Sequence, residues 1–175
     1  MSHEDIAAWE GFAVALAGAS AVLAGLVFVA VSINVERIVA VPGLPGRAGE
    51  SVIVFLTALI ACAFVLVPDQ SATALGIELL LLGLLVLALL FLILVPTLRV
   101  PSRQPTSWHA ARVVGILTAM LPIVLAGGSL LHWLPGGLYW LLGGVLAAVV
   151  VGTANAWVFL VEVVRDQRYR PIDVP

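Results

Sequence analysis

The sequence predicts an all-α integral membrane bundle of five transmembrane helices, with the N-terminus outside and the C-terminus in the cytoplasm. Three observations predict it: an apolar composition, five apolar runs separated by helix breakers, and arginines confined to alternate loops. Hydrophobic residues make up 62% of the chain and charged residues 10%, whereas soluble domains average roughly 45–50% and about 25%. Because so few polar residues cannot cover a water-facing surface, we expect all 175 residues to form a single transmembrane domain.

Five runs are long enough to cross a bilayer, which takes about 20 mostly apolar residues per helix. They cover residues 11–33, 49–67, 72–95, 110–131 and 138–161. Pro68 ends the second run, since proline cannot continue a helix. The breaker-rich stretch 42–46 predicts a loop over 34–50, with an extension of the first helix over 35–41 as the alternative for its leading part. Pro96 is the first of three prolines expected to separate the third and fourth runs.

The arginines set the predicted orientation, because positive residues in short loops stay on the cytoplasmic side. All eight cationic residues are arginines, and they lie in the first loop, around the third loop and after the last run: Arg37, Arg47, Arg99, Arg103, Arg112, Arg165, Arg168 and Arg170. The N-terminal segment, the second loop and the fourth loop contain none. We therefore expect the two termini on opposite sides of the membrane. The absence of a positive region before the first run indicates a retained helix and no secretory signal.

Lysine is absent, and alanine, glycine, valine and leucine are frequent. This bias is typical of a GC-rich bacterial genome, so we expect a multi-pass protein of the bacterial plasma (inner) membrane.

Small residues recur at helical spacing in two of the runs. Gly18 and Gly25 belong to such a ridge on the first run, and Gly144 and Gly152 to one on the fifth. Ridges of this kind let membrane helices approach closely, so packing within or between subunits is the favoured interpretation. The alternative is that the first-run ridge, which ends at Ser32, lines a narrow pore. The leucine-rich third run is expected to face mainly lipid.

Polar residues inside the runs are the candidates for an ion pathway. Glu78 is expected about 10 Å below the outer surface, where a carboxylate is costly and marks either a pathway or a neutral acid that hydrogen-bonds a neighbouring helix. Ser32, Asn34 and Asn155 form a second polar layer near the cytoplasm. Glu36 lies at the same cytoplasmic end of the predicted bundle.

Acidic and basic residues gather at this cytoplasmic end. They are Glu36, Glu50 and Glu162, opposite Arg37, Arg47, Arg112 and Arg165. We expect surface ion pairs, which contribute little individually.

Pro122 interrupts the fourth run and removes a backbone hydrogen bond, which predicts a kink and a possible hinge. Enzyme motifs are absent: the sequence has no HExxH zinc helix, no phosphate-binding glycine loop and no Cys-x-x-Cys pair. We expect no catalysis, no cofactor, no metal and no nucleic-acid partner.

Four segments carry a resemblance. They are Phe28-Val29-Ala30-Val31-Ser32-Ile33-Asn34, Leu44-Pro45-Gly46-Arg47-Ala48, Val67-Pro68-Asp69-Gln70-Ser71 and Leu75-Gly76-Ile77-Glu78-Leu79. Over about the first half of the chain, the sequence resembles a group of uncharacterised small multi-span bacterial membrane proteins. The resemblance implies a membrane fold, and it implies no particular activity for this chain.

Embedded polar groups, small-residue ridges and the lack of a soluble domain predict a homo-oligomeric channel, or channel-like transporter, for small ions. The alternative is a non-catalytic accessory subunit or scaffold that docks onto a larger membrane complex. A third, weaker alternative is a lipid-binding protein with a cleft beside the kinked fourth helix.

Overall fold

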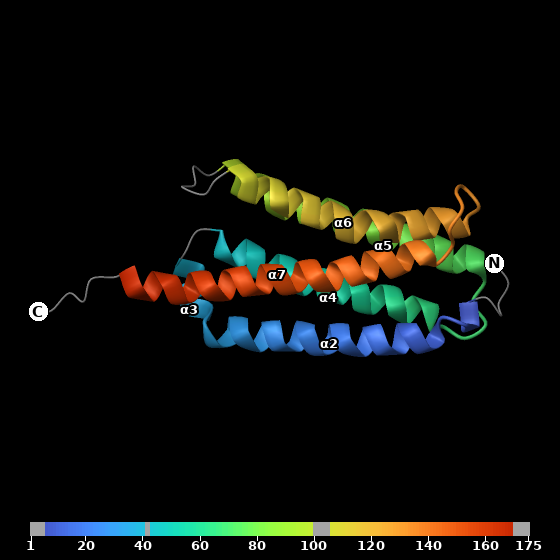
Figure 1. The fold of residues 1–175 in the computed structure, drawn as a ribbon, viewed down its shortest axis with the longest axis horizontal. Helices are drawn as coiled ribbons and strands as arrows, with labels where there is room; N and C mark the ends of the chain where they lie inside the picture. Colours follow the sequence, from blue (N-terminus) through green and yellow to red (C-terminus); the bar gives the residue numbers. More distant parts are fainter. Residues whose placement is uncertain (1–5, 41–42, 100–105, 170–175) are drawn as a thin grey trace, which may run out of the picture.

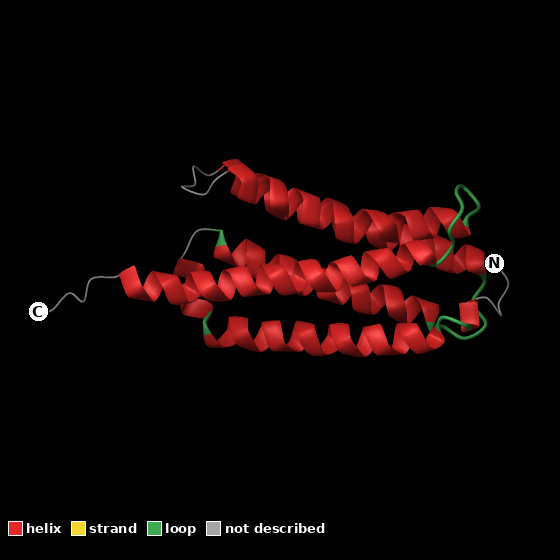
Figure 2. Ribbon diagram, viewed as in Figure 1, coloured by secondary structure: helices red, strands yellow, loops and turns green. Residues whose placement is uncertain are grey.

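The chain folds into long helices joined by short connections (Figure 2). The structure is a computed structural model and describes residues 6–40, 43–99 and 106–169. Its helices are α2 (Glu10–Ile33), α3 (Val35–Ala40), α4 (Leu44–Val65), α5 (Ala72–Arg99), α6 (Thr106–Leu130) and α7 (Tyr139–Tyr169). These segments contain no strand, and five of the helices are long and apolar enough to cross a membrane. The fold is therefore all-helical, as expected.

The five spanning segments lie close to the predicted runs: Glu10–Ile33, Leu44–Val65, Ala72–Val95, His109–Leu130 and Tyr139–Val158. The largest difference is at the start of α4. Much of the predicted loop over 34–50 is helical: α3 follows Asn34 within the stretch where further helix was the alternative, and α4 begins earlier than predicted, at Leu44. Pro45 stands in the first turn of α4, where a missing N–H costs no helix hydrogen bond. Gly43, at φ +88°, supplies the left-handed turn before it.

Two helices run further than the sequence predicts. Pro96 does not end the third helix, because α5 continues to Arg99. A proline so near a helix end removes a single hydrogen bond, which a helix tolerates. The last helix, expected to end at Val161, extends to Tyr169. At about 1.5 Å per residue, this adds roughly 12 Å beyond the predicted span.

The helices lie side by side in an elongated bundle (Figure 1). In the middle lie α4 and α7, with α2 on one side and the pair α5 and α6 on the other. The closest packing is α5 on α6, followed by α2 on α4, α6 on α7 and α4 on α7. Successive spans run in opposite directions, because short turns join them.

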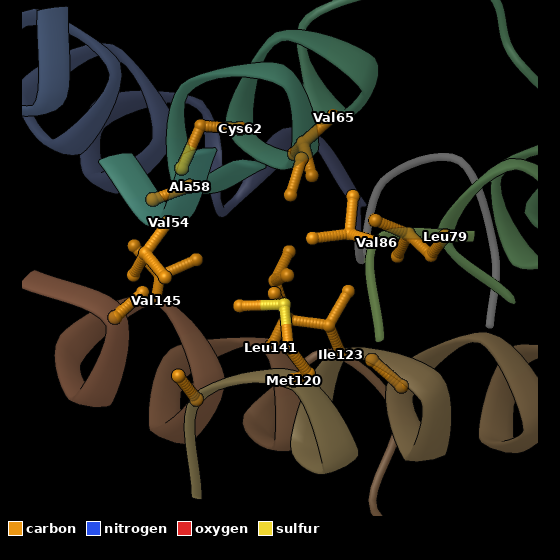
Figure 3. Close-up of a cluster of buried hydrophobic side chains, with 14 of the residues drawn as sticks. Val54, Ala58, Cys62, Val65, Leu79, Val86, Met120, Ile123, Leu141 and Val145 are labelled. Carbon is orange, nitrogen blue, oxygen red and sulfur yellow. The ribbon is translucent and has the colours of Figure 1, made fainter. Parts of the chain in front are cut away.

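A cluster of buried apolar side chains fills the space between α4, α5, α6 and α7 (Figure 3). Its labelled members are Val54, Ala58, Cys62, Val65, Leu79, Val86, Met120, Ile123, Leu141 and Val145. In contrast, only 17% of the apolar segment of α2 is buried inside the bundle. Most of the buried residues therefore come from the later four spans, and α2 adds Ala13, Ala24 and Val27 from its side of the bundle.

The third span, predicted to face mainly lipid, has 28% of its apolar segment buried, and its buried side packs tightly on α6 through glycines. Contact of its other faces with lipid stays a prediction. A Cβ added to Gly127 would lie 2.6 Å from the backbone N of Leu80 and 2.7 Å from the carbonyl O of Gly76. Real Cβ atoms do not approach backbone so closely, so these two helices touch through their main chains. The exposed residues of α5, such as Leu81, Leu85 and Leu92, are on other faces.

The two ends of the bundle differ in character. The helix directions place Arg37, Arg47, Arg112 and the last turns of α5 and α7 at one end. At the opposite end, the Trp9 ring packs edge-on against the Tyr139 ring, with centroids 5.1 Å apart. The start of α2 and the start of α7 therefore lie at the same end, as five alternating spans require.

Candidate functional site

A buried ion pair joins α4 to α6 at the arginine-bearing end. The Nε and Nη2 atoms of Arg112 donate hydrogen bonds to the two carboxylate oxygens of Glu50, the Nε bond at 3.3 Å. Glu50 is 1% exposed and Arg112 is 8% exposed. Because the contact is bidentate and shielded from water, it is stronger and more directional than a surface pair.

A second buried arginine, Arg47, lies one turn before Glu50 on α4 and is only 5% exposed. It stands in the first turn of the helix, where the helix dipole is positive and disfavours a cation. The carbonyl of Arg47 accepts a hydrogen bond from the buried Ser51 hydroxyl at 3.1 Å. A desolvated guanidinium in this position requires negative charge nearby, and Glu50 belongs to the same two turns.

These two arginines line a cavity of about 380 Å³ between α4, α6 and α7. The cavity is lined by Arg47, Ala111, Arg112, Gly115, Val151, Ala154, Asn155 and Val158. Ala111 and Ala154 are exposed, so the cavity opens on the surface of the bundle between α6 and α7. The charged residues named in its lining are Arg47 and Arg112, of which Arg112 is paired with Glu50, and Asn155 adds an amide. Guanidinium and amide groups are hydrogen-bond donors, so polar chemistry in this cavity would come from these three side chains.

Of the predicted polar layer, only Asn155 belongs to this cavity. The Ser32 hydroxyl donates to the carbonyl of Phe28 at 2.8 Å, and the Asn34 amide donates to the carbonyl of Ala30 at 2.9 Å. Both side chains therefore donate their hydrogen bonds to the backbone of the preceding helical turn. Glu36 is exposed on α3.

Glu78 lies at the other end of the bundle, seven residues into α5. The Gln70 amide, in the turn before α5, donates to its carboxylate at 2.6 Å. The donor of this hydrogen bond therefore lies in a connecting turn. The sequence had suggested a partner on a neighbouring helix, and this contact does not involve one. The distance between the ends separates Glu78 from Asn155 and Glu36, so these three residues do not form one cluster.

The four predicted packing glycines divide into two kinds. A Cβ on Gly144 would lie 2.7 Å from Ile123 Cγ1, and one on Gly152 would lie 2.8 Å from the Phe55 ring. On α2, a Cβ on Gly18 or Gly25 would meet no atom within 4 Å. The α7 glycines therefore lie against neighbouring helices, whereas the α2 glycines face outward.

Pro122 lies inside α6, which remains helical on both sides of it. Thr118 is exposed, and its hydroxyl donates to the carbonyls of Val114 and Gly115. Since Thr118 does not line the cavity, the hinge at Pro122 stays a prediction.

The sequence places Glu50 and Arg112 among ion pairs at the same end of the bundle, and the structure pairs these two residues. The expected exposure is wrong for both, because Glu50 and Arg112 are buried. The early start of α4 places Arg47 on a helix, one turn before Glu50, instead of in a loop. A signal was present: Arg47 and Glu50 are three residues apart, on one helical face if Pro45 begins the helix. Within the described segments, no group of three or more His, Cys, Asp or Glu residues is placed to hold a metal.

Five helices long and apolar enough to cross a bilayer are the feature of a multi-pass membrane protein. Compared with models of protein families, with curated proteins and with solved structures, the chain matches none of them.

Proposed function

We propose that the protein is a small homo-oligomeric channel, or channel-like transporter, for small ions, in which the cavity between α4, α6 and α7 binds the ion. The observation that carries the proposal is the pair of buried arginines, Arg47 and Arg112, on this cavity. Ionisable residues within membrane spans are costly, and they commonly mark ion or substrate pathways.

The oligomer in this proposal forms through α2. Gly11, Gly18 and Gly25 recur every seven residues, and a Cβ on any of them would meet nothing within 4 Å. Small residues on a membrane helix favour close approach of another helix. Since no helix of the same subunit covers them, we place the α2 faces of several subunits against one another around the centre of a ring. Ser32 continues this face toward the arginine-bearing end.

The membrane and the orientation are part of the same proposal. We place the arginine-bearing end in the cytoplasm and the N-terminus outside, by the positive-inside rule. The composition favours the bacterial plasma membrane. Glu36 and Glu78 are then polar points near the inner and outer ends of the pathway.

Ion flux into and out of liposomes tests the function. Reconstituted protein is expected to release chloride or potassium faster than empty vesicles do. Asn155→Leu, which replaces the amide in the cavity, is expected to reduce flux. Thr153→Leu is the matched control, because Thr153 is an exposed polar residue two positions away on α7. Glu36→Gln and Glu78→Gln extend the test to both ends. Flux no greater than that of empty vesicles would refute the proposal.

The second candidate is a non-catalytic accessory or scaffold subunit, and the same outward glycine face of α2 favours it. In that case, α2 docks a different membrane protein and the chain does not assemble with itself. The mass of the particle in mild detergent separates the two: several identical subunits support the channel, whereas a monomer that co-purifies at fixed stoichiometry with another membrane protein supports the scaffold.

A further inference from the structure

We propose that the cavity between α4, α6 and α7 is a blind, water-filled inlet, which admits water as far into the bundle as Val151 and hydrates the amide of Asn155. The inference concerns the cavity on which the proposed function rests, and it names the medium that fills this cavity. Access of water is therefore the property to be measured.

The shape of the cavity is the first argument. Its deepest lining residues are Gly115 on α6 and Val151 on α7, because these two helices run in opposite directions. A Cβ added to Gly115 would lie 3.2 Å from Val151 Cγ1, so the two residues meet at this level. Beyond them, Ala119 and Ala148 are fully buried. The cavity is therefore closed toward the middle of the bundle, and it lies on the side where α6 and α7 diverge toward the arginine-bearing end (Figure 1).

The amide of Asn155 is the second argument. Asn155 is half-buried in the wall of the cavity, and its side chain makes no hydrogen bond to any residue that the structure describes. The amide nitrogen can donate two hydrogen bonds, and the amide oxygen can accept them. Leaving such a group without partners is costly, and a lipid acyl chain offers neither a donor nor an acceptor. Water offers both.

The charges beside the cavity also favour water over hydrocarbon. Arg47 and Arg112 line the cavity, and a guanidinium group remains charged in proteins. A medium of low dielectric constant weakens the solvation of any charge beside it. This argument holds whatever partners the two side chains have within the protein. A cavity filled with water keeps a polar medium beside both.

The volume of the cavity is sufficient for several water molecules. The cavity measures about 380 Å³, and water in the liquid occupies about 30 Å³ per molecule, so there is room for roughly ten. Cavities that stay empty in proteins are lined by apolar groups. Here the guanidinium groups and the Asn155 amide come from three different helices, so polar contacts are available on several sides of the cavity.

Val151 provides a position at which water in the inlet can be detected. Val151 is the thirteenth residue of α7 and Leu84 the thirteenth residue of α5, and both helices begin at the end of the bundle opposite the arginines. At about 1.5 Å per residue, each lies roughly 18 Å from the start of its helix, which is well inside a hydrocarbon core of about 30 Å. Leu84 is exposed on the outside of the bundle, whereas Val151 lines the cavity. The two positions therefore differ in surroundings at a similar depth.

Cysteine labelling of the full chain in liposomes tests the inference. In a Cys62→Ala background, Val151→Cys and Leu84→Cys are treated with charged methanethiosulfonate reagents on both sides of the membrane, and labelling is followed by mass spectrometry. The reagents react with the thiolate, which apolar surroundings disfavour, so we expect Val151→Cys to react at least about tenfold faster than Leu84→Cys. The unsubstituted chain, whose Cys62 is buried, is expected not to react and controls for unfolding.

A second substitution tests the role of the amide. Asn155→Leu, added to Val151→Cys, makes the wall of the cavity more apolar, and we expect labelling to slow at least about fivefold because apolar cavities do not hold water. Thr153→Leu is the matched control, because Thr153 is exposed and does not line the cavity, and it should leave the rate unchanged. Should Val151→Cys misfold, Ala154→Cys replaces it, with the exposed Ala88→Cys on α5 as its control.

The inference is overturned if the cysteine in the cavity reacts no faster than its control on α5, or if Asn155→Leu leaves the labelling rate unchanged. Because labelling needs no ion flux, the inlet can hold water in a protein that conducts nothing. Conversely, a protein that conducts along a different route can leave Val151 dry. The proposed function and this inference therefore fail independently.

Discussion

The carboxylate of Glu50 and the guanidinium of Arg112 form a buried pair across 62 positions of sequence. They join the first turns of α4 to the second turn of α6 within the apolar part of the bundle. Removing one partner of a buried pair leaves the other charged and desolvated, which is the main energetic consequence of such a contact.

Breaking this pair is expected to destabilise the fold strongly. Arg112→Gln or Glu50→Gln should lower the free energy of unfolding by about 3–5 kcal/mol. Replacing both at once, with Glu50→Leu and Arg112→Met, should restore much of the loss, because no unpaired charge remains. Unfolding in mixed micelles of increasing SDS content measures these differences. Arg37→Gln, at an exposed position, is the control, and a single variant no less stable than this control would contradict the prediction.

The main-chain contact between α5 and α6 predicts that Gly127 cannot carry a side chain. Gly127→Ala places a methyl group 2.6 Å from the Leu80 N atom, so the helices must separate, at a cost of about 1–3 kcal/mol. Gly143→Ala is the matched variant, because a Cβ there meets nothing within 4 Å. It should be neutral or stabilising by up to about 1 kcal/mol through helix propensity. The same SDS titration compares them, and equal stabilities would argue against a close approach.

Ser129 fixes the turn between α6 and α7. Its hydroxyl donates to the Leu134 carbonyl at 2.9 Å and accepts from the Gly137 N–H at 2.6 Å. Ser129→Ala leaves both backbone groups without this partner, and we expect a loss of about 1–3 kcal/mol. Ser32→Ala should cost far less, since the Ser32 hydroxyl bonds only the exposed face of its own helix. Thermal unfolding followed by circular dichroism in detergent distinguishes the two, and similar midpoints would remove Ser129 from this role.

Because the glycines of α2 face away from the rest of the subunit, we expect substitutions there to affect subunit assembly and leave the folding of the subunit unchanged. Gly18→Leu and Gly25→Leu have open space in the subunit, so the helical content and melting temperature should be unchanged. If α2 contacts another subunit, the same variants should reduce the oligomer to monomer in native mass spectrometry. Val22→Leu changes an exposed, already bulky residue on the same helix and serves as control. An oligomer that survives both glycine variants would move the subunit contact to a different helix.

Some features of this protein follow from local sequence alone. The five spans can be predicted because about 20 apolar residues must form a helix in lipid, where every backbone group needs an internal partner. Pro68 and the polar residues beside it end the second span at a predictable place. The common end for Arg37, Arg47 and Arg112 likewise follows from alternation along the chain.

The tertiary structure decided which residues meet. Glu50 and Arg112 pair because α4 and α6 both pack on α7, and this arrangement is not contained in hydropathy. Gly127 and Gly25 are the same residue type in similar apolar runs, yet one contacts a neighbouring backbone and the other faces outward. Apolar residues on all sides of a membrane helix conceal which face is buried, so only the packing of the helices separates the buried arginines and glycines from the exposed ones.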